Sequence, residues 1–347
     1  FSGPILLSLG QDPLVAELTE AYLVIAGWGI APAVLMTVLR SHLSALDHPR
    51  IVLWATLAGV AFNAFVNWVL IFGNLGAPEM GVRGAALASL LTHLLILVVP
   101  ACYAALHKDL RQDTLFARFW NPDWEAMGQV FRLGWPIGLT LLSESGLFMA
   151  TMVMMGWLGP NALAAHGIAI QICSTTFMVH IGLSQAATVR AGRAWGLGDI
   201  ANLRLAGFAA LILSGAMVAA TILAFLVIPA PMISLFLDPA DPLRPEIIAM
   251  GAGLLAVAAL FQLADAGQVM ALGLLRGVQD TRVPMIYALV SYWLLGLPAA
   301  WFLGFPMGFG GQGIWAGLVV GLAFAAGLMM ARFWRGPARR AIGTPAA

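Results

Sequence analysis

The sequence predicts an all-α membrane protein, a bundle of helices that crosses the bilayer many times. Its 347 residues are 61% hydrophobic and only 10% charged, and their mean hydropathy is +0.91. A soluble domain carries about 25% charged residues. A chain so poor in polar groups cannot cover a globular surface with them, so we expect most of its surface to face lipid.

The apolar residues form runs long enough to span a bilayer, which takes about 20 residues as a helix. Lipid offers no hydrogen-bond partners to backbone N–H and C=O groups, so segments that span a membrane are helices or strands of a closed barrel. The runs in this chain are too long for barrel strands. Residues 1–9 resemble the last turns of another span. The nine runs are 15–39, 51–73, 84–106, 133–157, 163–189, 204–236, 247–275, 284–304 and 313–332.

The loops between these runs alternate in charge. Of the 17 Lys and Arg residues, 15 fall on one side of the expected membrane, and only Arg83 and Arg244 fall on the other. By the positive-inside rule the basic side is cytoplasmic. We therefore expect a multi-pass protein of the inner membrane with a cytoplasmic C-terminus. The basic tail, residues 333–347, either sets this topology alone or also binds anionic lipid.

The longest polar stretch joins two halves of the chain. Within it, Asn121-Pro122 is a helix start signal, and Trp124, Met127 and Phe131 follow at helical spacing. We interpret residues 108–132 as a cytoplasmic linker that contains a short interfacial helix.

The two halves resemble each other in sequence. Three segment pairs share an offset of 229 to 233 residues: 12–14 with 241–243, 81–89 with 310–318, and Asp47 with Asp280. This offset crosses six spans, an even number, so both copies keep the same orientation. The pattern predicts a parallel repeat about an axis along the membrane normal.

The repeat predicts twelve helices in two six-helix lobes. The counterpart of the second half would begin about 100 residues before Phe1, which leaves room for three spans. We therefore expect helices one to three to be absent from this chain, and a chain without them not to transport by itself. Residues 1–107 are then the remnant of the N-terminal lobe, and 133–332 are the C-terminal lobe.

Only two acids, Glu144 and Asp265, lie deep within the spans; Glu17, Glu20 and Arg204 lie near the ends of their runs, and no Lys or Arg lies deep within a run. Both acids fall near mid-depth, where an ionisable group costs a few kcal/mol and marks an ion or substrate path by default. With no base to pair either, each could carry a proton or hold a cation in its place. The alternative is a neutral structural carboxyl held by hydrogen bonds.

Polar residues accompany both acids at helical spacing. Gln262, Asp265 and Gln268 follow at i, i+3 and i+6, roughly one helix face. We expect such stripes to line a cavity, although they could also join helices by hydrogen bonds. The other stripes consist of Thr140, Glu144 and Thr151, and of Gln171 and Thr175.

The first half has a weaker polar feature. Asn63 and Asn67 lie four residues apart on one helix, and Ser89 could face them from the next span. Amide oxygens can coordinate a cation, but hydrogen bonding between helices explains the pair equally well. The same packing interpretation holds for His166 and His180.

Other classes of function lack a signal. Cys102 and Cys173 both lie in apolar runs, without a disulfide framework or CxxC metal motif. We find neither a His/Cys/acid cluster nor a nucleophile motif, so we do not expect an enzyme. We expect no cofactor, no nucleic-acid partner, and a monomer in membrane lipid.

Several segments resemble the multidrug and toxic compound extrusion (MATE) transporters. They include FNAFVNWVLIFG (62–73), GWPIGLTLLSESGLF (134–148) and FQLADAGQVMALGLLRGVQDTRVP (261–284), and the resemblance covers nearly the whole chain in the right order. The resemblance implies two rocking lobes. It also implies export of amphipathic, often cationic compounds, driven by inward flow of sodium or protons.

Within that family, acids at the positions of Glu144 and Asp265 mark the NorM-like branch and imply a cation site in the second lobe, with Na⁺ as one candidate. Several members place a tyrosine four residues before the second acid; here this residue is Phe261. Asn63, Asn67 and Ser89 fall where the resemblance implies a first-lobe cation site.

The sequence thus favours a cation-coupled multidrug exporter, with sodium or a proton as the coupling ion. A flippase for lipid-linked sugars of the same superfamily is the alternative. Such a cavity is expected to carry basic residues for the pyrophosphate, and none lies in the spans of this chain.

Overall fold

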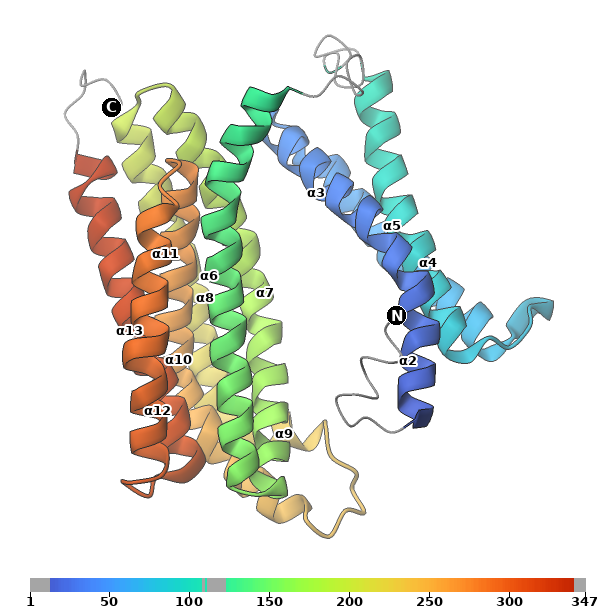
Figure 1. Ribbon diagram of the computed structural model, residues 1–347, viewed down its shortest axis with the longest axis vertical. Coiled ribbons are helices and arrows are strands. Elements are labelled where there is room, and N and C mark those ends of the chain that lie inside the picture. The colour runs from blue at the N-terminus through green and yellow to red at the C-terminus, as the bar shows by residue number, and fades with distance from the viewer. Residues whose placement is uncertain (1–12, 108–109, 111–122, 340–347) are drawn as a thin grey trace. The chain divides into compact units, whose positions relative to one another are not determined.

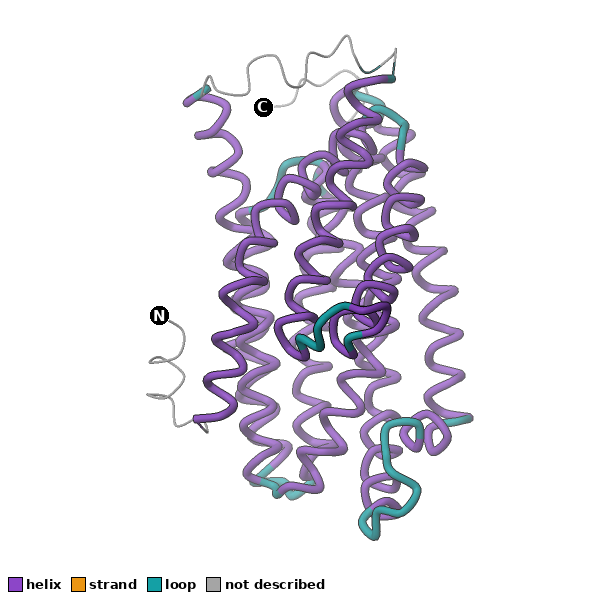
Figure 2. Tube along the Cα trace, turned by 90° about the vertical axis from the view of Figure 1, so that its right-hand side faces the viewer, coloured by secondary structure: helices purple, strands orange, loops and turns teal. Residues whose placement is uncertain are grey.

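The computed structural model describes residues 13–107, 110 and 123–339, and over these residues the chain forms helices and loops with no strand (Figure 2). Nine helical segments of this described part are long and apolar enough to cross a membrane. The predicted all-α, multi-pass architecture is confirmed. The expected helix end at residues 1–9, most of the linker before residue 123 and the tail from residue 340 lie outside the described residues.

The chain divides into two compact units, residues 1–122 and 123–347. The first contains α2 (Pro13–Ala26), η1 (Gly27–Gly29), α3 (Ile30–Ala45), α4 (Pro49–Phe72), η2 (Asn74–Gly76) and α5 (Gly81–Leu106). The second contains α6 (Trp124–Trp157), α7 (Pro160–Gly196), α8 (Ile200–Val227), α9 (Pro229–Ser234), α10 (Arg244–Gly277), α11 (Arg282–Leu289), η4 (Val290–Gly296), α12 (Leu297–Gly304), α13 (Gly310–Arg335) and η5 (Pro337–Arg339) (Figure 1).

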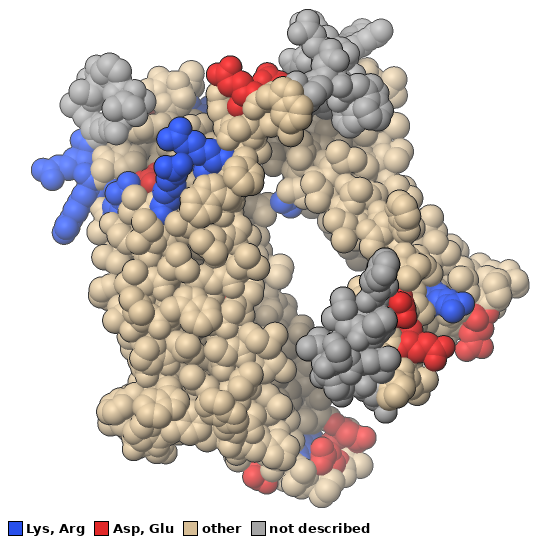
Figure 3. Space-filling view, in the orientation of Figure 1, with Lys and Arg blue, Asp and Glu red and all other residues tan. Residues whose placement is uncertain are grey.

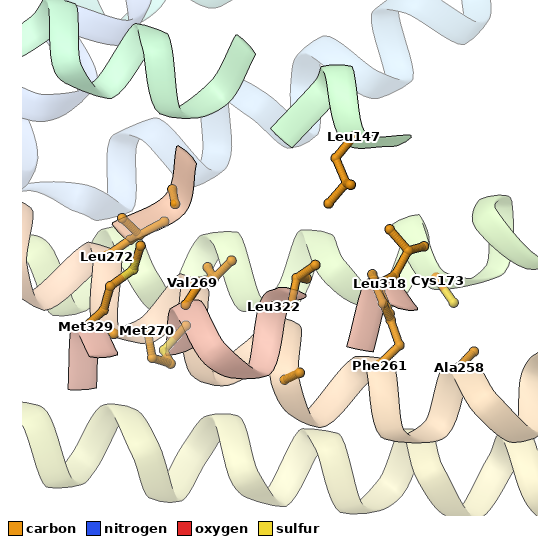
Figure 4. Close-up of a cluster of buried hydrophobic side chains, with 14 of the residues drawn as sticks. Leu147, Cys173, Ala258, Phe261, Val269, Met270, Leu272, Leu318, Leu322 and Met329 are labelled. Carbon is orange, nitrogen blue, oxygen red and sulfur yellow. The ribbon is translucent and has the colours of Figure 1, made fainter. Parts of the chain in front are cut away.

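Helix α10 forms the core of the second unit. It packs against α7, α8 and α13, and a larger share of its apolar stretch is buried than in any other described span. Leu147 of α6 and Leu318 of α13 lie in the same buried cluster as Phe261 and Val269 of α10 (Figure 4). Because Asp265 lies between these two α10 residues, the core itself carries one of the two acids.

Glycines allow the helices of this unit to approach closely. A Cβ atom on Gly317 of α13 would collide with the backbone nitrogen of Ala300 in α12. A Cβ atom on Gly277 of α10 would lie 2.6 Å from the carbonyl oxygen of Thr188 in α7. Small residues at such crossings are typical of membrane helices, whose association depends on close packing.

A π-helical turn, η4, joins α11 to α12 within one span. Its residues Ser291 and Tyr292 are fully buried, and the indole nitrogen of Trp293 donates a hydrogen bond to Ser143 Oγ of α6, 2.8 Å away. A wider turn of this kind changes which side chains face the neighbouring helices, and π-helical turns are frequent at functional sites.

Two boundaries differ from the sequence prediction. The run 204–236 is not one helix: α8 ends at Val227, and Pro229, which has no backbone N–H to continue the ladder, begins α9. The expected separate interfacial helix is not seen in its described part. From Trp124 onward the chain forms the first turns of α6, which Asp123 caps by accepting a hydrogen bond from the Ala126 nitrogen at 3.0 Å.

The backbone of the two units repeats the internal symmetry of the sequence. Helices α5 and α13 begin at Gly81 and Gly310, and both glycines are left-handed, with φ of 51° and 56°. Asp47 and Gln279 are also left-handed, with φ of 63° and 62°. Asp47 therefore corresponds to Gln279, and the sequence alignment of Asp47 with Asp280 is off by one residue.

Charge is distributed unevenly along the second unit. On the visible face in Figure 3, most of its arginines lie at the end where α7 and α10 finish, and the middle is uncharged. The acids of the 238–246 loop lie at the opposite end. At the basic end, Arg332 of α13 pairs with Asp280 after α10, with Nε and Oδ2 2.5 Å apart.

The close approach of α12 and α13 generates a prediction. Gly317→Ala should force the two helices apart and lower the free energy of unfolding by about 1–3 kcal/mol, the usual cost of overpacking. Gly327→Ala is the matched control, because a Cβ atom at this position of the same helix would have nothing within 4 Å. Thermal unfolding midpoints in detergent compare the two, and equal midpoints would contradict the packing described above.

Candidate functional site

Asp265 lies in the buried interior of the second unit. Its side chain is 3% exposed, and its Oδ1 atom has no hydrogen-bond partner among the described residues. Gln262 and Gln268, one turn away on either side, are fully buried. The face predicted from the i, i+3, i+6 spacing therefore points into the helix bundle.

The structure brings Glu144 and Asp265 together. Both line a cavity of about 270 Å³ inside the second unit, Glu144 from α6 and Asp265 from α10. The two carboxyl groups therefore border the same space. Two like charges near each other disfavour each other's ionised form, and a bound cation or a proton relieves this repulsion.

Aromatic side chains form the rest of this cavity. The rings of Phe148 and Phe261 meet edge to face with centroids 6.1 Å apart, and those of Phe261 and Trp315 do so at 5.3 Å. The remaining lining residues, all from α7, are Ile170, Cys173, Ser174, Phe177 and Met178. An apolar, aromatic wall beside two acids is chemically suited to an organic cation, through cation–π contact and charge.

A second cavity adjoins Glu144 on its other side. It measures about 440 Å³ and carries Arg276 together with Ser145, Ser184, Gln185 and Thr188. The expectation that no base could pair with either acid is therefore corrected for Glu144. Arg276 lies in the last turn of α10, and the helix packing turns its side chain into a cavity that Glu144 also lines.

Tyr292 is a second residue that was not predicted from the sequence. Its ring is fully buried in η4, and the carboxylates of Glu144 and Asp265 both act electrostatically on its hydroxyl group. The hydroxyl and the Gln268 amide interact, although they form no hydrogen bond of good geometry. Two tyrosines, Tyr287 and Tyr292, lie in this apolar span, and the contact of Tyr292 with α10 depends on the π-helical turn.

The other residues predicted to line a cavity, Gln262 and Gln268 among them, do not line either of these two cavities. Gln171 and Thr175 are exposed on α7, and the Thr175 hydroxyl donates to the Gln171 carbonyl at 3.0 Å. Thr140 is buried and donates to the Pro136 carbonyl at 2.8 Å. Thr176 takes the position expected for Thr175, since its hydroxyl accepts a hydrogen bond from the Gln262 amide.

The two buried histidines of this unit have packing partners. Trp315 Nε1 donates to His166 Nδ1 at 3.1 Å. An indole nitrogen can only donate, so His166 Nδ1 accepts and the ring is neutral with its proton on Nε2. His180 Nδ1 lies 3.0 Å from the Ser214 hydroxyl of α8. These contacts favour the packing interpretation of both residues.

In the first unit, the two asparagines form a hydrogen-bonded chain. Asn67 Nδ2 donates to Asn63 Oδ1 at 2.9 Å, and Asn63 Nδ2 donates to Thr92 Oγ1 of α5 at 3.0 Å. The Ser89 hydroxyl instead bonds the Ala85 carbonyl within α5, at 3.0 Å. The structure thus joins Asn63 and Asn67 to each other and to Thr92, and does not join Ser89 to them.

The chain matches a known family over most of its length. The MatE family profile matches residues 1–69 and 136–302. The chain is 44% identical over 344 residues to the "Probable multidrug resistance protein NorM" of Rhizobium meliloti (strain 1021), a match that covers 99% of this chain and 73% of that protein. The protein of the same name from Agrobacterium fabrum is 43% identical, covering 95% and 71%. The chain therefore belongs to the MatE family, the MATE transporters.

Solved structures share the fold at low sequence identity. A eukaryotic MATE transporter, AtDTX14, matches with a TM-score of 0.81 at 21% identity, over 97% of this chain and 74% of that one. A MOP superfamily transporter from Pyrococcus furiosus matches with a TM-score of 0.86 at 20% identity, over 98% and 74%. The latter is described as having a binding pocket of reverse polarity that suggests a different function.

The His166–Trp315 contact generates a prediction. His166→Leu should leave a buried indole N–H unsatisfied and cost about 1–3 kcal/mol of stability. His166→Gln offers a new acceptor oxygen and should cost less. Thermal unfolding midpoints in detergent separate the variants, and a Leu variant as stable as the Gln variant would contradict the assigned hydrogen bond.

Proposed function

We propose that this protein is a cation-coupled antiporter that exports amphipathic, mostly cationic compounds by alternating access. Membership of the MatE family supports transport, and the names of the relatives support multidrug export. The observation that carries the proposal is the cavity in which Glu144 and Asp265 sit against aromatic walls. The proposed setting is the inner membrane, with a monomeric protein and a cytoplasmic C-terminus.

The cavity supports a simple exchange mechanism. A small cation, sodium or a proton, binds the two carboxyl groups from outside and lowers the affinity for an organic cation at the same place. After the lobes rock inward, cytoplasmic substrate displaces the small cation. Because each ligand weakens the other by the same factor, one coupling free energy describes both steps.

The two proposed lobes keep separate roles in this mechanism. Residues 1–107 belong to the N-terminal lobe and 133–332 to the C-terminal lobe, with 108–132 as the linker between them. Asn63 and Asn67 are proposed as part of a first-lobe cation site. Their amides already bond each other and Thr92, so only the remaining lone pairs of their oxygens are free for a cation.

Tyr292 is proposed as the hydroxyl ligand of the second-lobe site. Phe261 lines the cavity but has no oxygen to offer. The Tyr292 hydroxyl is buried, interacts with both acids and has no hydrogen bond of good geometry to hold it elsewhere. Hard cations bind oxygen ligands. The hydroxyl of Tyr292 in η4 would therefore add a third oxygen ligand to the two carboxyl groups.

Glu144→Gln and Asp265→Asn, made in the full-length protein, should each reduce efflux of an organic cation dye to the level of empty vesicles, because each removes a charge that holds the coupling cation. Glu246→Gln is the matched control, an exposed acid at the far end of α10. Dye efflux from proteoliposomes, under separate sodium and proton gradients, measures the effect and identifies the coupling ion. If both variants exported the dye at the wild-type rate, the assignment of Glu144 and Asp265 to the cation site would be contradicted.

The same vesicles test the alternative function, a flippase for lipid-linked sugars. That function requires flipping of a pyrophosphate-linked lipid without cation-driven dye efflux. Arg276 is the one basic residue lining either of the two cavities around Glu144 in the described part of the chain, and an acid shares its cavity. This arrangement suits a cation better than a pyrophosphate.

Tyr292→Phe should raise the half-saturating concentration of the coupling cation, because the site loses one oxygen ligand. Adding Phe261→Tyr to this variant should restore part of the affinity by returning a hydroxyl from α10. The readout is dye efflux as a function of cation concentration. An unchanged half-saturating concentration in Tyr292→Phe would remove Tyr292 from the ligand set.

A further inference from the structure

Glu144 lies between two cavities that differ in charge, one with a second acid and one with an arginine. It lines the aromatic cavity together with Asp265, and it also lines the larger cavity together with Arg276. Phe148 and Phe177 line both cavities as well. The Glu144 side chain therefore borders both the cavity that holds a like charge and the cavity that holds an opposite charge.

The position of Arg276 is fixed by the packing of α10 on α7. Ser184 Oγ donates to the Val269 carbonyl and Thr188 Oγ1 donates to the Gly273 carbonyl, each at 2.8 Å. Gly273 and Gly277 allow this approach, because a Cβ atom on either would collide with α7. The last turn of α10 therefore has little freedom to move Arg276 away from the cavity.

Arg276 has no direct ion-pair partner in the part of the chain that the structure describes. The carboxylate that acts on it is Glu144, across the cavity, together with the Tyr292 hydroxyl group. Both side chains are half-buried. A half-buried guanidinium and a half-buried carboxylate on one cavity, not yet in contact, attract each other more strongly than two surface charges would.

We propose that Arg276 is the internal counter-ion of Glu144, which pairs with it whenever the coupling cation leaves the site. This inference rests on the proposed function and adds a step to it. When the cation is bound, Glu144 faces Asp265. When the cation departs, Glu144 turns to Arg276, so the unit never holds two bare acids side by side. Arg276 thus competes with the cation and promotes its release, which makes it a positioning residue for coupling.

The competition predicts the sign of a mutational effect. Arg276→Gln removes the competitor, so the half-saturating concentration of the coupling cation should fall by about tenfold, the order of effect of one partly screened unit charge near the site. The maximal rate of dye efflux should fall as well, because release becomes slower. Arg276→Lys keeps the positive charge, so its half-saturating concentration of the coupling cation should remain within about twofold of the wild-type value.

Two further variants separate this role from a structural one. Arg282→Gln removes an arginine from the same end of the unit, on a cavity that Glu144 does not line, and should leave the half-saturating concentration unchanged. Gln185 lines the Arg276 cavity from α7. Adding Gln185→Lys to Arg276→Gln returns a positive charge from another helix and should restore the wild-type value. A purely structural arginine would not be rescued in this way.

The experiment is dye efflux from proteoliposomes of the full-length protein, at rising concentrations of the coupling cation. A half-saturating concentration in Arg276→Gln equal to the wild type, or higher, would overturn the role of Arg276. Failure of the Gln185→Lys rescue would overturn it as well. If the wild type itself shows no cation-driven efflux that Glu144→Gln abolishes, the proposed function fails instead. The two failures are therefore distinguishable.

Discussion

The structure depends on one constraint, the burial of a carboxyl group inside a helical bundle that presents an apolar surface to lipid. Asp265 is 3% exposed and has an oxygen without a hydrogen-bond partner among the described residues. An ionisable group at membrane depth is costly and rare, and it marks a functional site by default. The surrounding features are consistent with this need: fully buried glutamines one turn to either side, a second acid on α6 and a buried tyrosine hydroxyl.

Close helix packing holds these groups in place. Helix α10 meets α7 through glycines and through hydroxyl groups that bond its carbonyls, and it meets α13 across a cluster of leucine and aromatic side chains. Both cavities around Glu144 are bounded by α6, α7 and α10. A small shift of α6 against the other two would change both cavities at once.

Much of this was predictable from sequence, and the reasons for the rest are physical. Hydropathy predicted the spans, and the isolated acids in them indicated Glu144 and Asp265, because lipid makes such residues rare. Helical spacing also placed Gln262 and Gln268 correctly on the inner face. Neither these two residues nor Gln171 and Thr175 line the two cavities around Glu144, because polarity alone does not tell which side chains border a given cavity.

The residues that were missed depend on contacts between helices. Arg276 lies eleven residues after Asp265, in the basic loop region that topology rules already explain, and its approach to Glu144 follows from the docking of α10 on α7. Tyr292 reaches α10 through the π-helical turn η4, which no periodicity of the sequence indicates. The off-by-one error at Asp47 has a similar origin, since only the backbone shows which loop residue is left-handed.

The central claim is that one cavity binds the organic cation and the coupling cation in turn. Equilibrium binding of an organic cation dye to the purified full-length protein, measured at increasing concentrations of sodium or protons, tests it most directly. If the two cations share the cavity, the apparent Kd of the dye rises with the concentration of the coupling cation in the wild type and is independent of it in Glu144→Gln. A wild-type Kd that stays constant under both cations would contradict it.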